Sequence, residues 1–179
     1  MKYDISQLRK LETELALLEQ RHFCDFFKQH DYSRNSSDVV CFNLKSLLDV
    51  ERTYYGPGFY VILTDYSDSD NRCSLTVDGL KAIYRGHCYT VKKRLKSHLF
   101  NNHYRSSLQE TEVRYDVCMK LDGKNGINIL ETPFVEHKWR VIVHKMKRSS
   151  KMIREQAELA FDEIFYRPSG SKERKMKGA

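Results

Sequence analysis

Two phenols, a guanidinium and an imidazole stand at spacings that could bring them to one site. Tyr60 and Tyr84 fall near equivalent points of two segments with the pattern of adjacent strands. Arg94 and His98 are four residues apart in a predicted helix, so they share one face of it. Gly86 lies where the second strand leads into this helix, and a residue without a side chain lets the backbone approach a ligand. Such a set suits phosphodiester hydrolysis, which needs a base for water, cations for the transition state and a metal at the leaving oxygen.

Apolar periodicity predicts the elements that must position these groups. Helices are expected over 4–29, over 91–100 with Thr90 as N-cap, and from Ser149 or Ser150 to about residue 166. Strands are expected over 59–63, 80–84, 112–121 and 139–146, the first two pairing antiparallel and the second ending at Gly86. This order predicts an α+β fold with a small central antiparallel β-sheet flanked by helices.

The motifs around the two tyrosines resemble those of the GIY-YIG nuclease superfamily. That family has a G-I-Y strand, a Y-I-G strand, a helix with an Arg followed by a His or Tyr, and a later helix with a metal-binding Glu. Here the first motif reads Gly58-Phe59-Tyr60 and the second reads Tyr84-Arg85-Gly86. Ten residues separate Tyr84 from Arg94 and four more lead to His98, as in the family. The resemblance covers roughly residues 55–170.

The resemblance implies the GIY-YIG fold and a division of the chain. Residues 1–50 are expected to form an N-terminal helical extension, and 51–170 the nuclease domain with an inserted segment at about 101–138. Residues 171–179 are expected to be a basic, disordered tail. The apolar heptads of the first helix last about two repeats, which favours packing on the domain over a dimer helix.

The resemblance also implies a role for each group. Tyr60 looks like the general base that activates water, acting as a phenolate, and Tyr84 would orient the water or the phosphate. Arg94 looks like the arginine that stabilises charge on the phosphate. His98 would bind the same phosphate or a nearby water, and His87 would be a further phosphate contact.

The metal ligand is expected in the first half of the last helix, where the family has its glutamate. Glu155 and Glu158 both fit this position, and the distance from the 139–146 strand favours Glu155 over the alternative Glu158. One carboxylate indicates one divalent cation, Mg²⁺ or Mn²⁺, in each active site.

Basic residues gather in two windows, although the net charge of the chain is only +7. Residues 81–105 and residues 138–154 each hold seven Lys or Arg and no acid, as expected of a surface that binds phosphates. The residues predicted to contact nucleic acid are Arg85, Lys92, Lys93, Lys96, Arg140, Lys145 and Lys147.

The resemblance implies a metal-dependent DNA endonuclease that leaves 5′-phosphate and 3′-hydroxyl ends, and a stand-alone chain of this size looks most like a type II restriction endonuclease. The alternatives are a homing, nicking or repair-type nuclease of the same family, and a non-catalytic nucleic-acid-binding protein that keeps the fold. DNA is the expected partner, together with other copies of the chain in a homodimer or higher oligomer.

Composition and motifs exclude several other classes. The apolar runs are too short to span a bilayer and the N-terminus has no apolar signal core, so no membrane partner is expected. Five widely spaced cysteines without a C-x-x-C pair fit a reducing, cytoplasmic compartment. Phosphate-loop, dinucleotide-binding and EF-hand patterns are missing from the sequence.

Overall fold

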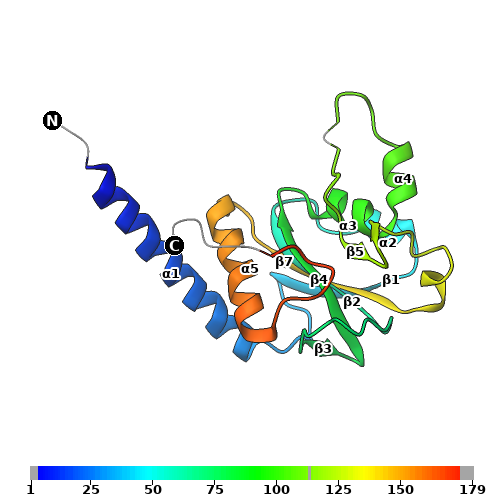
Figure 1. Ribbon diagram of the computed structural model, residues 1–179, viewed down its shortest axis with the longest axis horizontal. Helices are drawn as coiled ribbons and strands as arrows, with labels where there is room; N and C mark the ends of the chain where they lie inside the picture. The colour runs from blue at the N-terminus through cyan, green and yellow to red at the C-terminus, as the bar shows by residue number, and fades with distance from the viewer. Residues whose placement is uncertain (1–3, 113, 174–179) are drawn as a thin grey trace.

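The computed structural model, which describes residues 4–112 and 114–173, is built on a five-stranded antiparallel sheet (Figure 1). In spatial order its strands are β1 (Val39–Leu44), β7 (Trp139–Lys145), β2 (Gly58–Thr64), β4 (Leu80–Cys88) and β3 (Thr76–Val77). The helices are α1 (Ile5–Gln29), α2 (Leu47–Glu51), α3 (Val91–Leu99), α4 (Asn101–Ser106) and α5 (Lys151–Phe165). A two-stranded ribbon of β5 (Lys120–Leu121) and β6 (Lys124–Asn125) and a 3-10 turn at Phe134–Glu136 complete it. The predicted α+β class and central antiparallel sheet are confirmed.

The sheet separates two hydrophobic cores, because alternate residues of each strand face opposite sides. Tyr60 and Ile62 of β2 face the core that α3 covers, together with residues 119–134. Phe59 and Val61 face the second core, which lies under α1 and α5. Figure 1 shows α5 between the sheet and α1, with α2, α3 and α4 on the other side.

The first helix begins where its sequence predicts, but only its C-terminal half packs on the domain. Asp4 caps it by accepting a hydrogen bond from the Gln7 backbone N–H, at 3.1 Å. Its C-terminal half packs on α5 and buries Cys24 and Phe27. Its N-terminal half projects from the domain (Figure 1) and leaves an apolar stripe between 48% and 56% exposed. This apolar stripe of α1 consists of Ile5, Leu8, Leu11, Leu15 and Leu18. The expected packing on the main domain is therefore wrong for that half.

Three segments differ from the sequence-based expectation. β4 does not end at Gly86, because Gly86 pairs with Tyr60 and the ladder continues to Cys88. β1 pairs along its length with β7, so the sheet extends across the expected boundary at residue 50. The expected strand over 112–121 is regular only at Lys120–Leu121. Its alternating pattern fails to form a longer strand because the Met119 N–H donates to the ring of His98 instead of to a neighbouring strand.

Two expectations concern the chain ends and membranes. Residues 174–179 of the predicted basic tail lie outside the described residues. Within the described part of the chain, no helix has both the length and the apolar character that crossing a bilayer requires.

Phe161 should be one of the costliest side chains to truncate. It is fully buried on α5, with its ring centroid 5.8 Å from that of Phe27 and 5.6 Å from that of Phe59. We expect Phe161→Ala to lower the free energy of unfolding by about 3–5 kcal/mol, because the cavity joins α1, α5 and the sheet. Leu48→Ala, at a site 54% exposed, should change it by less than about 0.5 kcal/mol. Urea denaturation measures both, and equal effects would contradict this account of the core.

Candidate active site

The register of β2 against β4 places the two predicted phenols together. Tyr60 pairs with Gly86 and Ile62 pairs with Tyr84, so the two tyrosines are diagonal neighbours on one face, with ring centroids 6.1 Å apart. A Cβ on Gly86 would lie 3.0 Å from the Tyr60 hydroxyl and 3.1 Å from that of Tyr84. Glycine at this position therefore leaves the space that both hydroxyl groups occupy.

His98 binds the first of these phenols from α3. Its Nε2 lies 2.7 Å from the Tyr60 Oη, and its Nδ1 accepts a hydrogen bond from the Met119 N–H at 2.9 Å. Since a backbone N–H can only donate, the proton of the neutral ring must be on Nε2, which then donates to Tyr60. Burial, and the charge of Arg94 after it, lower the pKa of His98 well below its ordinary value, so the ring is neutral.

Arg94 lies one turn before His98 and faces the same pair of tyrosines. Its positive charge lowers the pKa of Tyr60, against the effect of burial, and its guanidinium lies 4.4 Å from the centroid of the Tyr115 ring. Its Nη2 donates to the Val117 carbonyl at 2.8 Å. The structure thus brings Tyr60, Tyr84, Arg94 and His98 together, as their spacing predicted.

The two phenols and His98 of this cluster are buried, whereas Arg94 is half-buried. Tyr60 is 0% exposed, and burial, followed by the effect of Tyr84, raises its pKa well above the ordinary value, while Arg94 opposes the rise. Residues 115–119 form the cover, because Arg94 holds the Val117 carbonyl and His98 holds the Met119 amide. In this closed state Tyr60 is a neutral phenol.

His87 and Arg85 lie on the other side of the sheet, because alternate residues of β4 face opposite sides. The Nε2 of His87 is 3.9 Å from the Glu158 Oε2 of α5. His87 therefore does not join the phenols, in contrast to its predicted place in one phosphate site. The prediction that Arg85 contacts nucleic acid is wrong. Its side chain is 3% exposed, donates from Nε to Asp162 at 2.9 Å and lies 3.5 Å from Glu158.

The two candidate metal ligands have different surroundings. Glu158 is 2% exposed and faces β4, and its charge is among the causes, after burial, that raise the pKa of Tyr84. Glu155 points to the outer side of α5, 3.8 Å from Lys151. Glu158 thus lies with Arg85 and His87 on the face of the sheet opposite the phenols, and only its charge acts on Tyr84.

A divalent cation fits this position only with ligands from outside the protein. Among residues 4–112 and 114–173, no group of three or more His, Cys, Asp or Glu side chains could hold a metal. Mg²⁺ commonly keeps several waters and takes one or two carboxylates plus substrate phosphates. Glu158 as the single carboxylate is compatible with that mode of binding.

Most of the other cations predicted to bind nucleic acid are paired with acids distant in the sequence. Lys92 and Lys96 lie 3.6 and 3.9 Å from Glu51, Lys93 lies 2.7 Å from Glu112, and Arg140 contacts Asp78. In the described part of the chain, only Lys145 and Lys147 of the predicted set have no carboxylate partner. Lys145 donates to the Ser37 carbonyl at 3.0 Å.

Arg154 is a residue that the sequence analysis did not single out. It is 0% exposed on α5, one turn before Glu158, and its guanidinium lies 4.3 Å from the centroid of the Tyr89 ring. Nη1 donates to the Ser149 carbonyl at 2.6 Å, but Nε and Nη2 are buried without a partner among the described residues. Such N–H groups are suited to an anion. Nothing in the sequence distinguishes Arg154, since it is one of seven cations in its window.

No family model matches the chain, and neither a curated protein nor a solved structure matches it. A function for this chain must therefore be argued from the chemistry of its described residues, because no related protein indicates one.

We expect Arg85 to matter for folding rather than for DNA binding. Arg85→Ala would leave Asp162 and Glu158 without their buried partner, which should lower the free energy of unfolding by about 3–5 kcal/mol. Lys93→Ala breaks an exposed pair and should cost less than about 1 kcal/mol. Chemical denaturation compares the two variants. An Arg85→Ala protein of normal stability and weakened DNA affinity would restore the original prediction.

Proposed function

We propose that the protein is a metal-dependent DNA endonuclease of the GIY-YIG type, acting as a type II restriction endonuclease and leaving 5′-phosphate and 3′-hydroxyl ends. The observation that supports it is the 2.7 Å contact between Tyr60 Oη and His98 Nε2, with Arg94 and Tyr84 around the same hydroxyl. The cluster contains a base, a cation and further polar hydroxyl groups, which hydrolysis of a phosphodiester requires.

Tyr60 is the general base in this proposal. The N–H of His98 and the positive charge of Arg94 both stabilise the phenolate, and they oppose the rise in pKa that burial causes. The phenolate takes a proton from the attacking water, which the Tyr84 hydroxyl orients. Arg94 stabilises the negative charge that develops on the phosphoryl oxygens.

Glu158 would hold the divalent cation, with Mg²⁺ or Mn²⁺ as candidates. When bound, the cation neutralises charge on the leaving 3′-oxygen. Arg85 acts on Glu158 as a positioning residue, since it connects β4 to α5 through Asp162 and Glu158.

Substrate must displace residues 115–119 to reach the phenols. Arg94 would exchange the Val117 carbonyl for a phosphate oxygen, and a hydrogen bond between two charged groups is stronger than one to a neutral carbonyl. Withdrawal of this cover also admits water, which reduces the burial that raises the pKa of Tyr60.

The closed state of the cluster favours a second candidate function, a non-catalytic nucleic-acid-binding protein that keeps the fold. Tyr60 is 0% exposed, so it cannot meet a water molecule without a conformational change. A protein of this kind would bind DNA and leave it intact under all metal conditions.

A second copy of the chain is the partner that we propose for the apolar stripe of α1. Exposed apolar patches of this kind mark interaction sites. Arg9 and Lys10 precede Glu14 and Glu19 along the helix, so a parallel pair would place like charges together. An antiparallel pair can place Arg9 and Lys10 alongside Glu14 of the partner subunit. A dimer of this kind would bring two active sites to one duplex.

Cleavage of supercoiled plasmid tests the catalytic assignment. We expect cutting with Mg²⁺ or Mn²⁺ and none with EDTA. Tyr60→Phe and Arg94→Ala should each lower the rate by about 10²- to 10⁴-fold, because they remove the base and the main cation. Glu158→Gln should lose activity to a similar degree, whereas Glu155→Gln, the matched control on the same helix, should cut like the wild type.

Thermal unfolding must show that each variant is folded. Wild-type rates in Tyr60→Phe would exclude the proposed base. Equal losses in both glutamate variants would remove the distinction between them, and DNA binding without any cutting would establish the non-catalytic alternative.

The dimer is tested by light scattering coupled to size-exclusion chromatography. The wild type is expected to show twice the monomer mass at micromolar concentration. The double change Leu11→Glu and Leu15→Glu should give a folded monomer, because charges then face each other in the apolar stripe. Leu48→Glu, exposed on α2, is the control and should stay dimeric. A monomeric wild type would exclude this interface.

A further inference from the structure

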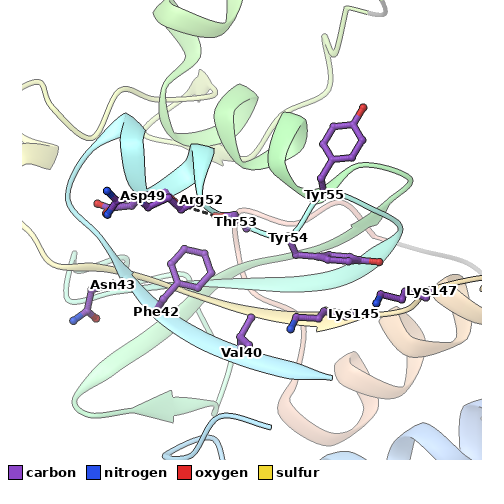
Figure 2. Close-up of a pocket in the computed structure, with 10 residues that line it drawn as sticks. All are labelled: Val40, Phe42, Asn43, Asp49, Arg52, Thr53, Tyr54, Tyr55, Lys145 and Lys147. Carbon is purple, nitrogen blue, oxygen red and sulfur yellow. Dashed lines mark hydrogen bonds between the residues drawn. The ribbon is translucent and has the colours of Figure 1, made fainter. Parts of the chain in front are cut away.

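A basic and aromatic groove lies apart from the tyrosine cluster, between the segment after α2 and the edge formed by β1 and β7 (Figure 2). Its volume is about 720 Å³. Phe42 and Tyr54 supply aromatic walls, and Arg52, Lys145 and Lys147 supply positive charge. A nucleotide fits a space of this size.

The groove lining carries a net positive charge, since it holds three cations and one carboxylate, that of Asp49, whose pKa Arg52 helps to lower after hydrogen bonds from Lys45 and Ser46. Lys145 and Lys147 are the two predicted nucleic-acid contacts without a carboxylate partner, and Arg52 likewise has no ion pair within 4–112 and 114–173. The one acid in the lining, Asp49, uses its carboxylate to accept the backbone N–H groups of Lys45 and Ser46. The groove thus offers three cations to an anionic ligand.

Tyr54 is held in place before any ligand binds. Its hydroxyl donates to the Pro57 carbonyl at 3.3 Å, and a Cβ on Gly56 would lie 2.4 Å from that hydroxyl. Glycine at 56 therefore allows the ring to fold over the backbone. Figure 2 shows the ring lying across the groove, with Lys145 and Lys147 on the same side. A fixed aromatic face beside cations is the arrangement that binds unpaired bases.

The groove and the tyrosine cluster share one face of the sheet. Phe42 and Tyr54 pack against the same hydrophobic core as Tyr60. The Gly56 carbonyl accepts the Val91 N–H at the start of α3, the helix that carries Arg94 and His98.

We propose that the groove binds an unpaired nucleotide of single-stranded DNA, with the base stacked on Tyr54 and the flanking phosphates on Arg52, Lys145 and Lys147. The proposal rests on the proposed nuclease function and specifies its substrate. The enzyme would prefer DNA that contains, or can be opened to give, a short unpaired segment, which favours the repair-type nuclease over a restriction endonuclease that cuts intact duplex.

Fluorescence anisotropy of a labelled single-stranded 12-mer and of a duplex of equal length tests this. Measurements in EDTA keep binding separate from cleavage. The wild type should bind the single strand more tightly than the duplex. Tyr54→Ala should weaken single-strand binding by about 5- to 100-fold, as loss of one stacked base implies. Gly56→Ala should weaken it too, because its Cβ would displace the Tyr54 ring.

Lys147→Ala, an exposed change that should not affect folding, should reduce the salt dependence of binding by about 0.7 in log–log slope. Tyr166→Ala and Arg72→Ala, both on exposed surface outside the groove, are the matched controls and should bind like the wild type. Unchanged affinity in folded Tyr54→Ala, or tighter binding of the duplex, would overturn the proposal. Cleavage without groove binding refutes the groove alone, and groove binding without cleavage refutes the nuclease alone.

Discussion

The pairing of Tyr60 with Gly86 is the constraint on which the site depends. A Cβ at 86 would lie 3.0 Å from the Tyr60 hydroxyl and 3.1 Å from that of Tyr84, so a side chain at this position would have to shift the two phenols. A slip of one residue would turn Tyr60 toward α5 and away from His98, because strand side chains alternate between faces. The hydrogen bond from His98 then fixes the ring of Tyr60, and the Met119 amide fixes the tautomer of His98. The register of β2 against β4, the position of α3 and the position of the proton on His98 therefore depend on one another.

The same alternation places the polar and charged side chains of β4 on two opposite faces of the sheet. Tyr84 faces the phenolic cluster, whereas Arg85 and His87 face α5 and its acids. Burying Arg85 against Asp162 and Glu158 is favourable only while all three charges stay together. This requirement fixes α5 on β4 and thereby fixes the position of Glu158 beside Arg85. The charge that looks like a DNA contact in the sequence is therefore a means of positioning a carboxylate.

The spacing of residues along the chain predicted those features of the site that depend on one strand or one helix. The two-residue period of strands and the four-residue period of helices were enough to group Tyr60, Tyr84, Arg94 and His98. They could not choose between Glu155 and Glu158, because the rotation of α5 about its axis is set by packing against the sheet. Charge windows failed for a related reason, since acids far away in the chain, such as Glu51, neutralise the cations. Counting charged residues along the sequence does not reveal ion pairs between distant segments.

The closed cluster and the open groove have complementary roles in the proposal. Opening residues 115–119 breaks the contact of Arg94 with Val117 and that of His98 with Met119, which requires free energy. A ligand can supply the free energy of opening only if it makes stronger contacts with the open state than with the closed state. Cations already exposed in the groove attract DNA before the cover moves. Binding away from the reacting atoms would then contribute to opening, and Tyr60 would meet water only when substrate is present.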